Sequence, residues 1–211
     1  MHLLPSMKDI FLITILLVIS IASYSQILTG QEVVKKSIMY HDPANHWGTL
    51  HAVLDFKETR PDGNDRNTLA EIENVNDYFN LVSFTEMHAL CYIYNKGLCT
   101  NMLDFYEEIS EEEIEKFKLN CKQTILLKNY YTYLWGMPMK LRDKGTIIEV
   151  SVMQETFNRK ESLVVKVNYK PEVGTDTWYF YFDPQTYALT GYRFYHDESQ
   201  MMGNTLHLMV F

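Results

Sequence analysis

The chain has 211 residues, with 19 Lys and Arg against 27 Asp and Glu, which gives a formal net charge of −8. An acidic chain without a basic stripe repels phosphate backbones, so nucleic acid is excluded as an expected partner. Aromatic residues make up 14% of the chain, an abundance that favours an aromatic-rich sheet and excludes a disordered chain.

The first residues have the order of a secretory signal peptide. Lys8 precedes an apolar run at residues 10–22, and Ser23 and Ser25 follow it as small residues. A membrane anchor is the alternative, but such a helix would span about 20 Å, short of the roughly 30 Å hydrocarbon core. We therefore expect residues 1–25 to be removed between Ser25 and Gln26. The mature chain would then be a soluble periplasmic or cell-envelope protein without a membrane span.

The next elements are a short helix and a series of strands. Thr29 and Glu32 have the spacing of a capping box, which predicts a helix ending near Tyr40. Apolar and polar residues then alternate at 50–56, the pattern of a half-buried strand. Similar runs at 67–75, 78–85 and 89–94 predict three more strands. Because the connections are short, including a turn at 61–63, we expect antiparallel pairing.

A helical insertion and a second set of strands follow. Ser110 and Glu113 form another capping box. A stripe then predicts one helix that continues to residue 135 and is stopped by Gly136 and Pro138; the stripe consists of Ile114, Phe117, Cys121 and Ile125. Strands are predicted at 146–152, 163–169, 178–182 and 187–195. A single α+β domain over residues 26–199, made of two meanders around a helical insertion, accounts for this order.

The chain has three cysteines, Cys91, Cys99 and Cys121. Two of them should pair in an exported protein. We favour Cys99 with Cys121, a bridge whose loop would contribute on the order of 3 kcal/mol by the chain-entropy model. Cys91 lies in a strand-like run and would be the buried thiol left over. Three free buried thiols are the alternative.

Several segments resemble a known family. The aromatic run at 178–184 with 186–189 is the most specific; 128–139, 40–43 and 58–63 match as well. They resemble a family of exported bacterial proteins of unknown function, whose fold is related to the periplasmic lipoprotein carriers (LolA-like) and the RseB-type envelope sensors. The similarity spans about residues 30–199. It implies a curved antiparallel sheet, a half-open barrel, with helices covering its concave face. In the carriers this cavity holds acyl chains.

The end of the chain departs from that family. Residues 201–211 form a Met-heavy tail, whereas the family continues with further strands. Read one base earlier, the codons of Met201, Met202 and Gly203 would encode Asp and Gly, as at a turn before a strand. We hypothesise a frameshift near Gln200, so that 200–211 is an aberrant tail and the barrel lacks its C-terminal strands; a naturally short family member is the alternative. An unpaired edge would favour aggregation.

Candidate catalytic or metal-binding residues are few. His41, Asp42 and His46 cluster near the first predicted helix, and His196 precedes Asp197. Two His and a carboxylate could bind a metal, and His beside Asp could act as an acid–base pair. His41 and His46 are five residues apart in a turn-like segment, which gives no fixed ligand geometry, and Asp42 and Asn45 are equally explained as turn formers. With no nucleophile elbow, phosphate loop or paired Cys motif, we expect no metal, no cofactor and no enzymatic activity.

Five consecutive aromatic residues at 178–182 put large apolar side chains on both faces of one strand. Either sheet packing and a helix cover both faces, or one face lines a ligand cavity. In the second case, the expected cavity and lid residues are Tyr131, Tyr133, Trp135, Met137, Met139, Trp178, Phe180 and Phe182.

We therefore expect a non-enzymatic envelope protein that binds a lipid or lipoprotein acyl chain. The first alternative is a structural or sensory protein-interaction module without a ligand cavity. A second is an enzyme that uses His41, Asp42 and His196, which would require these residues within about 5 Å of one another in a cleft.

Overall fold

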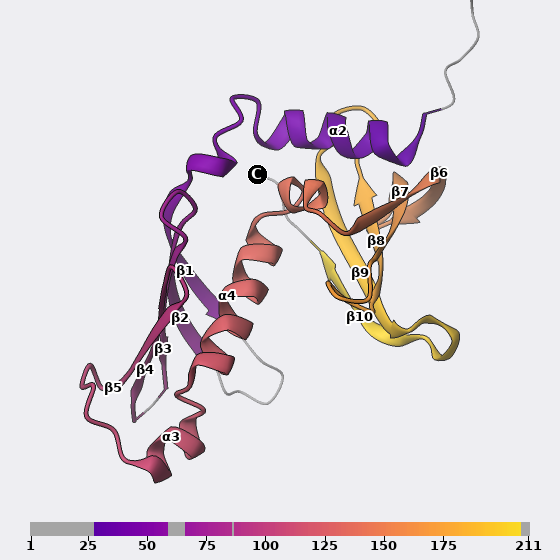
Figure 1. The fold of residues 1–211 in the computed structure, drawn as a ribbon. Coiled ribbons are helices and arrows are strands. Elements are labelled where there is room, and N and C mark those ends of the chain that lie inside the picture. Colours follow the sequence, from indigo (N-terminus) through magenta and orange to yellow (C-terminus); the bar gives the residue numbers. More distant parts are fainter. Residues whose placement is uncertain (1–27, 59–65, 86, 208–211) are drawn as a thin grey trace, which may run out of the picture.

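The computed structural model describes residues 28–58, 66–85 and 87–207. The predicted signal peptide with its cleavage site and the predicted turn at 61–63 lie outside these residues. The described residues form an α+β structure with ten strands in two antiparallel sheets, as Figure 1 shows. In this part of the chain, no helix is both long and apolar enough to cross a membrane.

The first sheet is a five-stranded meander. After α2 (Gly30–His41) and the 3₁₀ helix η1 (Trp47–Thr49), its strands follow one another in chain order. They are β1 (His51–Glu58), β2 (Arg66–Glu73), β3 (Tyr78–Phe84), β4 (Ala89–Asn95) and β5 (Leu98–Leu103). Three helices then lead to the second sheet: α3 (Glu111–Phe117), α4 (Cys121–Trp135) and the 3₁₀ helix η2 (Met139–Arg142).

The second sheet is also a meander, ordered β10-β9-β8-β7-β6. Its strands are β6 (Thr146–Phe157), β7 (Lys160–Tyr169), β8 (Thr177–Phe182), β9 (Leu189–Asp197) and β10 (Met202–His207), with the 3₁₀ helix η3 (Glu198–Gln200) before the last strand. Neither sheet closes on itself. The expected order of meander, helical insertion and meander is therefore confirmed, but the strands form two sheets where the family resemblance implied one curved sheet.

Each sheet has its own core. On the first sheet, Ile72, Phe79 and Leu81 are buried beneath α4, which lies along this face (Figure 1). On the second, Val165 and Phe180 pack against the apolar side of α2, which crosses that sheet (Figure 1). The split follows from the chain order, because the helical insertion separates the two meanders and supplies a covering element to the first.

The helix α4 also joins the two cores, through two tyrosines that are two positions apart in the sequence. Tyr131 packs against Phe56 of the first sheet, with ring centroids 5.1 Å apart. Tyr133 packs edge-to-face against Trp178 of the second sheet, with centroids 5.2 Å apart. Because neighbouring helical side chains point in different directions, one turn of α4 contacts both sheets.

The predicted pairing of Cys99 with Cys121 is confirmed. The disulfide connects β5 to the first residue of α4, with the Cα atoms 5.3 Å apart. Cys91 is a free, buried thiol on β4, as expected. Burial raises the pKa of this thiol, so it stays protonated and unreactive.

Two expectations about the elements were wrong. The single helix predicted from Ser110 to residue 135 is two helices, because Lys118 adopts a left-handed conformation (φ 56°) and Asn120 caps a new helix. Ile125 is consequently 40% exposed and does not continue the apolar stripe. In addition, β5 was not predicted, because apolar and polar residues alternate only weakly in its sequence.

The described part of the tail also contains a strand. Residues 202–207 form β10, which pairs antiparallel with β9 after a register shift between Met202 and Gly203. This pairing does not test the origin of the tail, so the frameshift near Gln200 stays a prediction that the coding DNA would decide.

Candidate functional site

The aromatic strand β8 is covered on both faces by the protein itself. Trp178, Phe180 and Phe182 face the core beneath α2, and the latter two are 0% exposed. Tyr179 and Tyr181 lie on the opposite face, in a cluster with Phe157. The Arg193 guanidinium lies over the Tyr179 ring, 4.9 Å from its centroid.

The structure disperses the expected cavity residues. Met137 and Met139 pack into the same core as Phe180 and Phe182, and Tyr131 packs against the first sheet. Trp135 is 49% exposed and contacts Phe56 edge-to-face. Tyr133 and Trp178 are the two members that line a hollow, of about 500 Å³, between α4 and residues 173–176.

This smaller hollow is bounded by phenols and charged side chains. The hydroxyls of Tyr133 and Tyr169 form a hydrogen bond with each other. Burial raises the pKa of Tyr169 to about 12, and burial likewise raises the pKa of Tyr133 far above its usual range. Both phenols therefore stay neutral. At the rim, a hydrogen bond of 2.9 Å joins His196 Nδ1 and Asp176 Oδ1.

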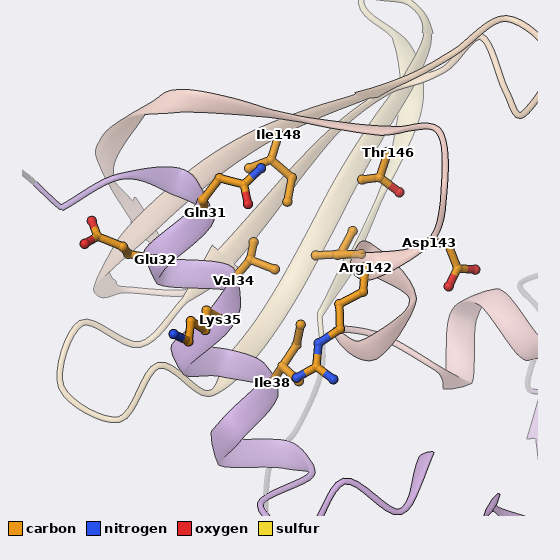
Figure 2. A pocket seen from close by; sticks show the side chains of 10 residues that line it. Gln31, Glu32, Val34, Lys35, Ile38, Arg142, Asp143, Thr146 and Ile148 are labelled. Atoms are coloured by element: carbon orange, nitrogen blue, oxygen red, sulfur yellow. The ribbon is translucent and has the colours of Figure 1, made fainter. Parts of the chain in front are cut away.

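A larger hollow, of about 570 Å³, lies between α2, η2 and the start of β6. Figure 2 shows its lining. Its apolar lining residues are Val34 and Ile38 on α2, Leu141 on η2, and Ile148 on β6. The first three are buried core residues and Ile148 is half-buried. We call it the α2–η2 hollow. Its polar lining consists of Gln31, Glu32, Lys35, Arg142, Asp143 and Thr146.

Local sequence explains why these elements meet there. The capping box of Thr29 and Glu32 fixes the start of α2, with Thr29 N–H donating to Glu32 Oε2 at 2.8 Å. Gly30 lets the first turn approach β6 closely, since an added Cβ would lie 2.2 Å from the Glu149 carbonyl oxygen. The register of β6 against β7 shifts between Ile148 and Val152 at this point, which is typical of a β-bulge.

The candidate catalytic residues His41 and Asp42 each make hydrogen bonds that stabilise the fold. His41 Nε2 accepts a hydrogen bond from Leu189 N–H at 2.9 Å, and burial lowers the pKa of His41. Asp42 accepts from the N–H groups of His46 and Trp47, at 2.6 and 3.0 Å, as a turn former does. Among residues 28–58, 66–85 and 87–207, no group of three or more His, Cys, Asp or Glu side chains could hold a metal ion.

Sequence reasoning missed the α2–η2 hollow. The apolar positions of α2 indicated a packed helix face, and Leu141 and Arg142 lie in a segment that carried no motif. One feature of the sequence could have indicated the hollow: Lys35 follows Val34, so a cation lies at the edge of the apolar stripe of this helix. That signal is common on surface helices and does not by itself identify a site.

By its fold, the chain is an α+β protein with two antiparallel sheets and a hollow where α2 crosses the second sheet. A family model described as a family of unknown function (DUF6503) matches residues 8–204, and the chain belongs to this family. No curated protein sequence matches the chain.

Proposed function

We propose that this chain is a non-enzymatic cell-envelope protein that binds an acyl chain or similar aliphatic ligand in the α2–η2 hollow. The observation that carries the proposal is a hollow of about 570 Å³ between α2, η2 and β6, whose walls include the apolar residues Val34, Ile38, Leu141 and Ile148. This volume falls within the roughly 300–1,000 Å³ range of small-molecule sites. Each methylene removed from water contributes about 0.8 kcal/mol.

Two further arguments support this proposal. The resemblance to the lipoprotein carriers implies a half-open barrel that holds acyl chains, and the α2–η2 hollow lies where a helix crosses an open antiparallel sheet. The signal peptide expected at residues 1–25 would bring the mature chain to the periplasm, where such ligands occur. A shared fold does not by itself define a function, so the proposal rests mainly on the hollow itself.

The proposal predicts that blocking the hollow abolishes ligand binding. Gln31 lines the hollow from an exposed position on α2, so the indole of Gln31→Trp can fill the space without disturbing the core. We expect at least about a 10-fold loss of affinity for dodecanol, equivalent to about 1.4 kcal/mol, measured by isothermal titration calorimetry.

Met39→Trp is the matched control, since Met39 is exposed on the same helix but does not line the hollow. It should bind dodecanol as the unmodified chain does. Equal affinities for all three proteins, or no binding by the unmodified chain, would rule out the α2–η2 hollow as the ligand site.

A protein-interaction module is the second candidate. It is favoured by the complete burial of Phe180 and Phe182, because these expected cavity residues are filled core. Exposed apolar side chains on the outward face of the first sheet, including Val53 and Leu69, would then contact the partner. This candidate predicts no dodecanol binding, so the same titration separates the two.

A further inference from the structure

The smaller hollow, of about 500 Å³, lies where α4 passes the second sheet. In Figure 1, α4 stands between the two sheets. Asn129, Tyr130 and Tyr133 line the hollow from this helix, and Thr175 and Asp176 line it from the connection between β7 and β8. We call it the α4 hollow. Its volume falls within the roughly 300–1,000 Å³ range of small-molecule sites.

The walls of the α4 hollow include side chains that are open to solvent. Tyr130 is 51% exposed, and Val173 is 54% exposed. Asn129 and Thr175 are exposed as well. The Tyr130 ring packs edge-to-face against the buried ring of Tyr131, with the centroids 5.4 Å apart. An exposed ring that a buried neighbour supports is an apolar surface that a ligand can cover.

The α4 hollow also contains hydrogen-bonding groups that the protein does not use. Among the residues that the structure describes, none forms a hydrogen bond with the side chains of Asn129, Thr146 or Thr175. Asp176 Oδ1 is bonded to His196 Nδ1 at 2.9 Å, which leaves Asp176 Oδ2 as a further acceptor. Amide and hydroxyl groups both donate and accept hydrogen bonds, and a carboxylate accepts them. This combination suits a ligand that carries several hydroxyl groups.

The charges in the lining favour a ligand without net charge. Lys140 and Asp143 form an ion pair with each other. The phenols of Tyr133 and Tyr169 stay neutral, because burial raises the pKa of both. Asp176 is the remaining carboxylate of the lining, and it would repel an anion. A neutral ligand needs no opposite charge and can use the polar groups directly.

We propose that the α4 hollow binds a short neutral saccharide. The C–H faces of a pyranose ring are apolar and pack on an aromatic ring, while its hydroxyl groups donate and accept hydrogen bonds. Tyr130 supplies the aromatic surface, and the polar contacts come from Asn129, Thr175 and Asp176 Oδ2. The inference does not depend on an acyl ligand in the α2–η2 hollow.

The test follows the indole N–H signals of the full mature chain by ¹H–¹⁵N NMR. The chain has three tryptophans, and single Trp→Phe variants assign their signals. Trp178 lines the α4 hollow, whereas Trp47 and Trp135 do not line it and are internal controls. The neutral probes are cellobiose, maltose and N,N′-diacetylchitobiose. We expect at least one of them to shift the Trp178 signal in a saturable manner and to leave the other two signals in place.

Glucuronate and choline are the anionic and cationic comparisons in the same titration. Both should bind more weakly than the best neutral disaccharide, because neither can pair its charge and also use the amide and hydroxyl groups of the lining.

Variants assign the binding to the aromatic surface. Tyr130→Ala removes the ring and should lower the affinity by about 3- to 10-fold. Tyr130→Phe keeps the ring and should bind as the unmodified chain does. Tyr106→Ala is the matched control, since Tyr106 is 72% exposed and lies outside the hollow. Circular dichroism and thermal melts verify that each variant is folded.

Three results would overturn the inference. The first is no saturable shift of the Trp178 signal with any of the three disaccharides. The second is an affinity that Tyr130→Ala leaves unchanged. The third is tighter binding of glucuronate or choline than of every disaccharide, since this would indicate a charged ligand. None of these results affects the proposed function, which the dodecanol titration tests.

Discussion

His41 is the residue whose chemistry is most sensitive to its surroundings. It ends α2, and its Nε2 atom accepts the hydrogen bond of Leu189 N–H on β9, so it ties the helix to the second sheet. The ring must be neutral at Nε2 to accept this bond. Burial acts in the same direction, because it disfavours the imidazolium and lowers the pKa of His41.

A pH dependence of stability follows from this shift. Since the folded pKa of His41 lies below the unfolded value of about 6.5, the unfolded chain binds more protons between the two values. The contribution of His41 is therefore fully present above about pH 6.5 and is lost as the pH falls through the folded pKa. His51, whose pKa is raised by Glu71, acts in the opposite direction, but its ring is exposed to solvent.

We predict that His41→Gln removes part of this acid sensitivity, because the Gln side chain has an oxygen acceptor that does not titrate near neutral pH. Urea unfolding at pH 7.5 and pH 5.5 measures the effect. A pH difference as large in His41→Gln as in the unmodified chain would contradict the assignment. His41→Ala leaves the Leu189 N–H without its acceptor and should cost about 1–3 kcal/mol at both pH values.

At the scale of elements, the contact between α2 and β6 determines whether the hollow exists. Gly30 permits that contact, because any side chain there would collide with the Glu149 carbonyl oxygen. We predict that Gly30→Ala displaces the first turn of α2 and lowers stability by roughly 1–3 kcal/mol, as overpacking does, and that it weakens dodecanol binding. Chemical denaturation and calorimetry give the two readouts.

Gly48→Ala provides a control for this prediction. It changes the same residue type in η1, where an added Cβ would meet no atom within 4 Å. Its stability and dodecanol affinity should match those of the unmodified chain. If Gly30→Ala behaves like Gly48→Ala, the close approach of α2 to β6 is not what shapes the hollow.

The disulfide is the second element-scale feature with a measurable consequence. Cys99–Cys121 connects β5 to the start of α4, the helix that covers the first sheet. Loss of a bridge of this loop length should cost about 2–4 kcal/mol by the chain-entropy model. We therefore expect a Cys99→Ala, Cys121→Ala double variant to unfold at lower urea concentration than the oxidised chain.

A thiol titration checks independently that Cys99 and Cys121 are paired. In denaturant without reductant, Cys91 alone should react with a thiol reagent, whereas all three cysteines should react after reduction. Full reactivity before reduction would contradict the pairing. Equal stability of the oxidised chain and the double variant would show that the bridge does not support the packing of α4.

Features encoded by neighbouring residues could be predicted. Both capping boxes, at Thr29 with Glu32 and at Ser110 with Glu113, form as their spacing indicates. Most strands also appear where the apolar residues alternate. The break between α3 and α4 could not be foreseen, because the apolar stripe continues in sequence across Lys118 while the chain adopts a left-handed turn there.

Features that depend on how distant elements pack were not predictable in the same way. At the scale of the whole molecule, the aromatic run of β8 indicated burial on both faces, which the structure confirms, but not which elements cover it. The α2–η2 hollow unites Val34 with Leu141 and Ile148, more than a hundred residues apart in sequence. No periodicity within one segment reports such a juxtaposition.

At the scale of the whole molecule, α2, η2 and the start of β6 enclose the α2–η2 hollow. The central proposal for this molecule is that an acyl chain occupies this hollow. The most direct test is photo-crosslinking with a dodecanoate that carries a diazirine near its methyl end, followed by peptide mass spectrometry. We predict labelling of peptides that contain residues 31–38 and 141–148, suppressed in Gln31→Trp. Labelling confined to other segments, or unaffected by that substitution, would contradict the account.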